Sequence, residues 1–133
     1  MKFMNEEHKA FYETRLAQCR YQDAYHKALV YTLGLTNDCR ANFDLLYDVK
    51  TGFVNPDIFR DENSGWITGT DRRIIYLAYH LYNDGCPTAH AMESGKEKEE
   101  EIGNYLISNL FDYPSEQFAY MLEAIRIRFE RVG

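Results

Sequence analysis

The chain has 133 residues, of which 27% are charged and 15% aromatic, and its formal net charge is −6 at pH 7. This length suits one hydrophobic core, so we expect a single helical domain over residues 1–133. The acidic balance argues against direct nucleic-acid binding, because neutralising phosphates requires an excess of basic residues on one face. No apolar run approaches the roughly 18 residues of a membrane span, so no membrane association is expected.

Three short helices are predicted before residue 48. Asn5 is placed to cap the first helix and Asp23 to cap the second, which Gly34 is expected to close in a left-handed conformation. Thr36 then caps a third helix that continues to about Tyr47. Three helices in so short a stretch suggest an antiparallel bundle.

The segment from residue 48 to residue 65 breaks the helical period. Lys50-Thr51-Gly52 has the chemistry of a turn, which makes one short β-hairpin near residues 48–55 an option. Residues 56–60 are predicted to form one extra helical turn, because a proline follows an asparagine at its start. A polar loop then leads to Trp66, the only tryptophan, which we expect to anchor the loop on the core.

The central element is predicted to be a helix near residues 70–83, capped by Thr68 or Thr70 and ended by Asp84-Gly85. Its apolar arc is too wide for a surface helix, so the other elements should pack around it. That arc contains Ile74, Leu77, Ala78 and Leu81, with Ile75 and Tyr82 at its sides. The remaining stripe contains Arg72, Tyr76, Tyr79, His80 and Asn83, with Arg73 at its edge.

The last helix is predicted to begin at Pro114 and Ser115, and it has the clearest amphipathic pattern in the chain. Between it and the central helix, the charged run at residues 96–101 reads as a solvated helix start or a connection. The apolar face of the last helix contains Phe118, Met121, Leu122, Ile125, Phe129 and Val132, and its outer face is expected to contain Ala124, Arg128 and Arg131. The predicted fold is therefore mainly α, a single-domain bundle of about five to six helices around the helix near residues 70–83.

No set of side chains predicts catalysis, a metal site or a cofactor. Cys86 and His90 form a lone Cys-x-x-x-His pair, whereas structural zinc normally uses two such pairs. Cys19 and Cys39 fall on apolar faces, where thiols are inert, and Cys86 is the least excluded nucleophile. The N-terminus lacks the apolar run of a signal peptide, so we expect a cytoplasmic protein with reduced thiols. The balance leans away from an enzyme.

One polar group is suited to an anion. Gly69-Thr70-Asp71-Arg72-Arg73 places backbone N–H groups and two guanidinium groups at the start of a helix, although Asp71 opposes a negative ligand. Alternatively, Asp71 caps the helix and the arginines pair with carboxylates of neighbouring elements. The candidate binding residues around this group are Trp66, Thr68, Thr70, Arg72, Arg73, Tyr76, Tyr79, His80 and Asn83.

Several phrases along the chain together resemble an uncharacterised family of Firmicutes, often found in clostridia and on their phages and conjugative elements. The phrases are Glu7-His8-Lys9-Ala10-Phe11-Tyr12, the run from Asp23 to Gly34, Trp66-x-Thr68-Gly69-Thr70, the run from Leu77 to Asn83, Pro87-Thr88-Ala89, and Phe118 followed by Glu123-Ala124-Ile125. The resemblance covers nearly the whole chain. Where this chain has Ile67, Asp71 and His80, the family tends to have Gln, Ser and Asn.

Two functions are expected from these features. The first is a small non-enzymatic interaction protein of a phage or mobile element. It is favoured by the lack of a recognisable set of catalytic residues, by the tyrosine content, by the acidity, and by the context that the resemblance implies. Its partner would be a host or element protein, such as a nucleic-acid-binding or defence protein that it inhibits. The alternative is a small-molecule or nucleotide-binding domain, with hydrolysis as an option. A homodimer that uses the last helix as its seam is a further option.

Overall fold

The structure, a computed structural model, describes residues 1–83, 104–111 and 115–130. In this part of the chain it contains seven helices and one two-stranded antiparallel sheet, which confirms the prediction of a mainly α fold with a short hairpin. The helices are α1 (Glu6–Gln18), α2 (Ala24–Leu33), α3 (Asn37–Ala41), α4 (Phe43–Leu46), α5 (Gly69–Asn83), α8 (Ile107–Leu110) and α9 (Phe118–Phe129), and the strands are β1 (Tyr47–Asp48) and β2 (Phe53–Val54).

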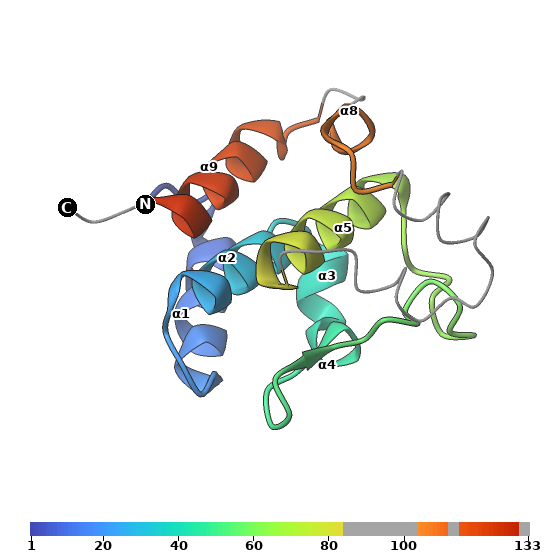
Figure 1. The fold of residues 1–133 in the computed structure, drawn as a ribbon, viewed down its shortest axis with the longest axis horizontal. Helices are drawn as coiled ribbons and strands as arrows, with labels where there is room; N and C mark the ends of the chain where they lie inside the picture. The colour runs from blue at the N-terminus through green and yellow to red at the C-terminus, as the bar shows by residue number, and fades with distance from the viewer. Residues whose placement is uncertain (84–103, 112–114, 131–133) are drawn as a thin grey trace.

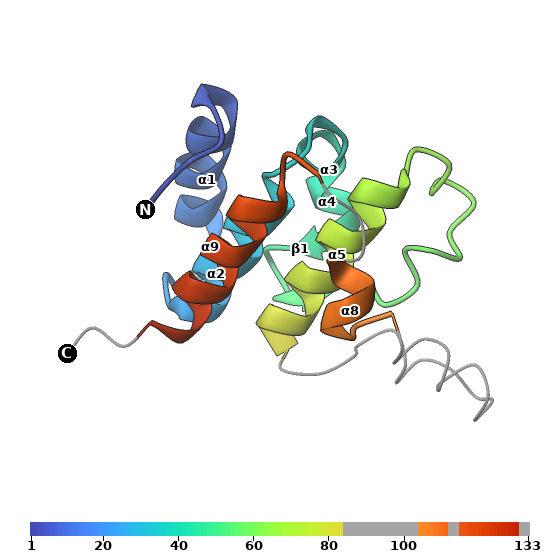
Figure 2. The same cartoon turned by 90° about the horizontal axis from the view of Figure 1, so that it is seen from above.

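Helices α2 and α5 pack against each other at the centre of the molecule (Figure 1). Helices α1 and α9 both lie against α2, while α8 lies beside α5 (Figure 2). The predicted apolar arc of α5 is buried, with Tyr82 at its side half-buried, but α1 and α9 pack on α2, so α2 and α5 organise the core together. No helix in the described ranges is long and apolar enough to cross a bilayer.

Side-chain caps determine where the first three helices begin. The cap residues are Asn5, Asp23 and Thr36, and an oxygen of each accepts a hydrogen bond of 2.8–3.1 Å from the backbone N–H three residues later. Each cap therefore satisfies an N–H group that the helix itself leaves without an acceptor. The third helix is shorter than predicted, because the chain departs from helical geometry at Asn42 and continues as a separate helix, α4.

Helix α5 begins with a reciprocal cap that also buries a carboxylate. The Thr68 hydroxyl accepts a hydrogen bond from the Asp71 N–H, and the Asp71 carboxylate accepts one from the Thr68 N–H, both at 3.1 Å. This is the geometry of a capping box with aspartate in the third position. Of the two predicted caps, the structure uses Thr68, and Asp71 is only 1% exposed.

Gly34 ends α2 in a different way from the prediction. Its φ of −84° and ψ of −2° lie in the right-handed region, so the left-handed conformation predicted for it is wrong. Crowding explains the glycine instead, because a Cβ here would lie 2.7 Å from His8 Cδ2 and 2.8 Å from Phe11 Cδ1. Helix α1 thus approaches the end of α2 more closely than a side chain at position 34 would allow.

The predicted hairpin follows α4 directly. Tyr47 pairs with Val54, and Asp48 pairs with Phe53. Gly52 occupies the turn with a φ of 77°, which is the left-handed conformation that glycine adopts without strain. The extra turn predicted at residues 56–60 is present as hydrogen-bonded turns: the Asp57 carbonyl accepts from the N–H groups of Arg60 and Asp61, and Asn55 Oδ1 accepts from the Asp57 N–H.

Helix α9 buries a different face from the predicted one. Ala124, expected on the outer face, is fully buried, together with Met121 and Ile127. Leu122, expected in the core, is 49% exposed, and so in large part are Phe118 and Phe129. Apolar residues surround most of this helix, so their spacing alone does not decide which side packs on α2. Several predictions concern residues outside the described ranges. They are the end of α5 at Asp84-Gly85, the charged run at 96–101, the start of the last helix at Pro114, and the places of Arg131 and Val132 on that helix.

Candidate anion-binding site

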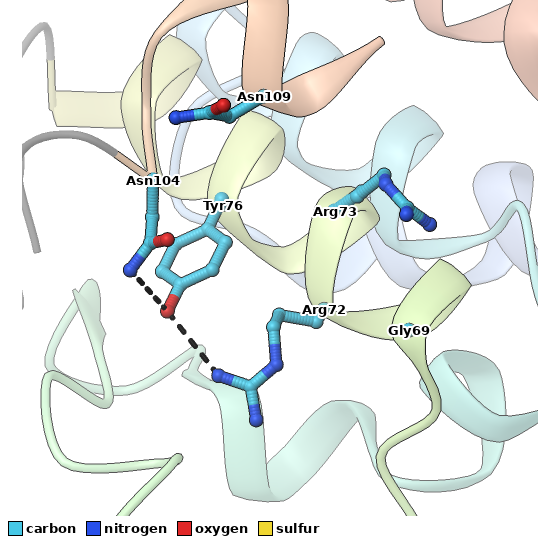
Figure 3. A pocket seen from close by; sticks show the side chains of 6 residues that line it. All are labelled: Gly69, Arg72, Arg73, Tyr76, Asn104 and Asn109. Carbon is cyan, nitrogen blue, oxygen red and sulfur yellow. Dashed lines mark hydrogen bonds between the residues drawn. The ribbon is translucent and has the colours of Figure 1, made fainter. Parts of the chain in front are cut away.

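An open pocket of about 310 Å³ lies between the first turns of α5 and the segment that contains α8 (Figure 3). Its volume is at the lower end of the range, about 300–1,000 Å³, that is typical of small-molecule sites. Helix α5 contributes Gly69, Arg72, Arg73 and Tyr76, and the segment at 104–110 contributes Asn104 and Asn109. The pocket therefore brings together three of the predicted site residues with two asparagines that the sequence did not indicate.

The side chain of Arg72 is held in place from two sides. Its guanidinium carbon lies 4.7 Å from the centroid of the Phe59 ring, and its Nη1 donates a long hydrogen bond of 3.4 Å to the Tyr76 hydroxyl. The same hydroxyl accepts a hydrogen bond of 3.3 Å from Asn104 Nδ2, which connects the two walls of the pocket (Figure 3). Stacking on an aromatic face orients a guanidinium while leaving most of its N–H donors available.

The aromatic support below Arg72 is itself packed. The rings of Phe59 and Tyr76 lie 4.7 Å apart at an interplanar angle of 36°, and Tyr105 meets Tyr76 edge-on at 4.9 Å. Both Tyr76 and Tyr105 are buried. The ring that carries the Arg72 contact therefore belongs to a fixed cluster, so the guanidinium is positioned before any ligand arrives.

The electrostatics of the pocket favour a negative ligand. In the described part of the chain, no carboxylate forms an ion pair with Arg72. Asp71, which is next to the arginines in sequence, does not line this pocket, because its carboxylate caps α5 and lies 3.9 Å from Cys39 Sγ. The Asp71 carboxylate, which would repel an anion, is thus engaged outside this pocket. The structure shows it as the cap of α5, as one of the two interpretations of the sequence predicted.

Two predicted site residues line a different pocket. Thr68 and Thr70 face a hollow of about 430 Å³ together with Asp38, Asp71 and Glu116. Hydrogen bonding to Asp71, together with burial and its negative charge, raises the pKa of Asp38 above its usual value. Its three carboxyl groups outnumber the one guanidinium group in the lining, that of Arg40, so this second pocket suits an anion less well than the first.

The other predicted residues do not form one site. Tyr79 is fully buried, and its hydroxyl donates a hydrogen bond of 3.1 Å to a main-chain oxygen at the end of α4. Trp66 packs at the edge of the core, where its Nε1 is buried without a hydrogen-bond partner in the described structure. His80 lies one turn beyond Tyr76, its ring 5.9 Å from that of Tyr105, and Asn83 is exposed at the last turn of α5. None of these four lines the pocket around Arg72.

Groups with other chemistry are engaged in the core or absent from the described residues. Burial raises the pKa of the Cys39 thiol to about 12, so this cysteine is unreactive at neutral pH. Within the described ranges, no three side chains among His, Cys, Asp and Glu come together in an arrangement that could hold a metal ion. Cys86 and His90 lie outside those ranges.

Comparison with known protein families gives one match, which extends over residues 1–132 and is described as a family of unknown function, DUF6075. The chain belongs to the DUF6075 family. This match covers nearly the whole chain, as the resemblance in its sequence predicted. Comparisons with curated proteins and with solved structures give no match. Membership of DUF6075 carries no activity with it, so the function has to be argued from the geometry of the chain.

Proposed function

We propose that this DUF6075 protein binds a small anionic molecule, such as a nucleotide or another phosphate or carboxylate compound, in the pocket between α5 and α8. The observation that carries the proposal is the Arg72 guanidinium, which is stacked on Phe59, hydrogen-bonded to Tyr76 and paired with no carboxylate in the described structure. Such a group in a chain of net charge −6 supports local selection for a negative ligand.

The rest of the lining suits this role. A guanidinium binds carboxylate and phosphate oxygens through two parallel N–H donors, which gives direction as well as charge. Asn104 and Asn109 add carboxamide groups, which both donate and accept hydrogen bonds and so suit the polar body of a small molecule. Gly69 keeps the mouth of the pocket free of a side chain beside Arg73. Among the described residues, the lining contains no His, Asp, Glu, Ser or Cys, so the described arrangement supports binding rather than hydrolysis.

Thermal unfolding in the presence of inorganic phosphate, mononucleotides and small carboxylates tests this proposal. A ligand that binds only the folded state stabilises it by about 2.7 kcal/mol at 100 times its Kd, so at least one of these anions should raise the melting temperature. The Arg72→Ala variant should lose that rise, and Arg72→Lys should retain only part of it, because an ammonium group keeps the charge without the planar pair of donors.

The matched control is Arg60→Ala, because Arg60 is an exposed arginine of the preceding loop that does not line the pocket. This variant should respond to the anion as the wild type does. If no anion shifts the wild type, or if Arg72→Ala and Arg60→Ala respond alike, the pocket is not an anion site.

A second candidate function is the small interaction protein of a phage or mobile element, acting on a host or element protein and inhibiting a nucleic-acid-binding or defence factor. The observation that favours it is a pair of aliphatic neighbours at the start of α8, Leu106 and Ile107, which are 55% and 74% exposed. Adjacent exposed aliphatic side chains are a feature of protein-binding surfaces. Affinity capture from a host lysate should recover a stoichiometric partner that Ile107→Glu no longer retains, and recovery of none would count against this candidate.

A further inference from the structure

A smaller pocket of about 210 Å³ lies at the hairpin, between the start of α2 and the last turns of α5. It shares no lining residue with the pocket around Arg72. Its volume is below the range of about 300–1,000 Å³ that is typical of sites for drug-sized ligands, so its occupant is small. We call it the hairpin pocket. Its described lining contains no acidic side chain, and the groups that decide its chemistry belong to Arg20, Tyr21, His26, Tyr47, Lys50 and Tyr82.

His26 forms a buried wall of the hairpin pocket and is only 9% exposed. Its Nδ1 lies 2.7 Å from the Asp23 carboxylate, which can only accept, so Nδ1 carries a proton and the neutral ring has its lone pair on Nε2. Nε2 lies 3.5 Å from the Tyr82 hydroxyl, whose one proton is donated to the Gly52 carbonyl at 2.6 Å. Among the described residues, the neutral ring therefore has an acceptor for which its neighbour has no proton.

A proton on Nε2 removes this mismatch. The ring then donates through Nε2 to the Tyr82 oxygen, while Tyr82 still donates to Gly52. The Tyr47 hydroxyl, 3.2 Å away, donates to the second lone pair of the same oxygen, so every proton in this group has an acceptor. The neutral ring and the Asp23 carboxylate together carry one negative charge, whereas the protonated ring and Asp23 carry none. Protonation therefore removes the repulsion between this wall of the hairpin pocket and an anion.

Two exposed cations of the hairpin pocket are available to such an anion. Arg20 and Lys50 form no ion pair with the described residues. The carboxylate of Asp48, two positions before Lys50, instead accepts hydrogen bonds from the N–H groups of Lys50 and Thr51 at 2.9 and 3.4 Å. The guanidinium carbon of Arg20 lies 5.5 Å from the centroid of the Tyr21 ring. A guanidinium and an ammonium group that line one pocket attract the same negative ligand.

We propose that the hairpin pocket is a second binding site, which takes up a small aromatic carboxylic acid as its anion and a proton. The proton is held on His26 Nε2, and the carboxylate of the ligand pairs with Arg20 and Lys50. Tyr21 is 55% exposed and offers a surface on which the aromatic ring of the ligand stacks. The ligand is thus smaller and more apolar than the nucleotides considered for the pocket around Arg72.

Benzoate is the probe, and NMR spectra of the imidazole groups of the full chain at pH 7.5 are the readout. The Arg72→Ala variant is the host, so that binding in the pocket around Arg72 does not contribute. Benzoate at up to about 20 mM, a range suited to the weak binding of so small a ligand, should move the His26 signal towards that of a protonated ring. The signals of His8 and His80 should stay in place, and His26→Gln identifies the signal that moves. Benzamide, which has the ring without the charge, should bind about tenfold more weakly or not at all.

Two variants of the host test the cations. Arg20→Ala and Lys50→Ala should each weaken benzoate binding about tenfold, because each removes a hydrogen bond to a charged group. Both side chains are exposed, so circular dichroism should show both variants as helical as the host. Lys9→Ala is the matched control, since Lys9 is exposed on α1 and does not line the hairpin pocket, and it should bind benzoate as the host does.

A His26 signal that benzoate does not move, or that benzamide moves as strongly, overturns the proposal. Equal affinities of the Lys9, Arg20 and Lys50 variants for benzoate overturn it as well. Acetate that binds as tightly as benzoate overturns the aromatic class of the ligand. Because the host lacks the Arg72 guanidinium, these outcomes are independent of the anion site proposed around Arg72.

Discussion

Replacing Gly34 with alanine should destabilise the protein, although alanine is the better helix former. At this position the backbone is right-handed, with a φ of −84°, so alanine meets no backbone strain. Its Cβ would instead lie 2.7 Å from His8 Cδ2 and 2.8 Å from Phe11 Cδ1. Carbon atoms in good contact are about 3.5–4.0 Å apart, so each ring would have to retreat by roughly 1 Å.

The His8 ring cannot retreat without loss. Its Nε2 donates to the Tyr31 carbonyl at 2.8 Å, and its Nδ1 accepts from the Met4 N–H at 3.1 Å. Overpacking of this kind costs about 1–3 kcal/mol. The reduced freedom of the unfolded chain offsets about 0.4–1 kcal/mol of that cost. We therefore expect Gly34→Ala to lower the free energy of unfolding by about 1–2 kcal/mol, equivalent to roughly 3–8 °C in melting temperature.

Urea unfolding of Gly34→Ala and Gly65→Ala measures the effect against a matched control. A Cβ at Gly65 meets nothing within 4 Å, and its φ is not positive, so this variant should be neutral or gain up to about 1 kcal/mol. The midpoint should fall for Gly34→Ala with the slope unchanged, because the surface exposed on unfolding stays nearly the same. Equal stability of the two variants would refute the crowding at position 34 as the reason for the glycine.

Three other outcomes follow from single groups. Acidification should destabilise the fold through His8, because burial lowers the pKa of this side chain below 6.5 in the folded state. The unfolded chain therefore takes up the proton at higher pH than the folded chain, and the free energy of unfolding falls as the pH drops below 6.5. Urea titrations from pH 8 to 5 should show this decline, and His8→Gln should lack that part of it. Thr68→Ala should cost about 1 kcal/mol in the same assay because it removes the cap of α5, whereas Thr70→Ala, at a position that does not cap, should cost less. Tyr79→Phe should cost about 0.5–1.5 kcal/mol through the loss of one buried hydrogen bond, and a thermal melt checks it.

Local signals in the sequence were sufficient for the centre of the fold. The caps at Asn5, Asp23 and Thr36 depend on residues only three positions apart, and the apolar arc of α5 is wide enough to leave one way of burying it. Helix α9 has apolar residues on two sides, and the choice between them is made by α2, which approaches the small side chain of Ala124. Sequence periodicity contains no information about that approach.

The candidate site was predictable only in the part that one helix supplies. Arg72, Arg73 and Tyr76 follow from the periodicity of α5, but Asn104 and Asn109 reach the pocket through tertiary packing of a short segment without a periodic pattern. Tyr79 was predicted on the polar stripe of α5 but lies in the core, because tyrosine combines a large apolar ring with one polar atom. Tyr79 has a polar atom, yet its ring is buried and its hydroxyl finds an acceptor inside the core.

The partly buried indole of Trp66 gives the protein a built-in optical reporter. As this is the only tryptophan, all indole fluorescence originates at the junction between the loop and α5, six positions before Arg72. Its N–H is buried and has no acceptor among the residues that the structure describes, a state that typically costs about 1–3 kcal/mol. Any loosening that admits water to this group is favoured locally and shifts the emission to longer wavelength. The emission wavelength therefore reports the environment at the start of α5, and global unfolding shifts it in the same direction as a local opening.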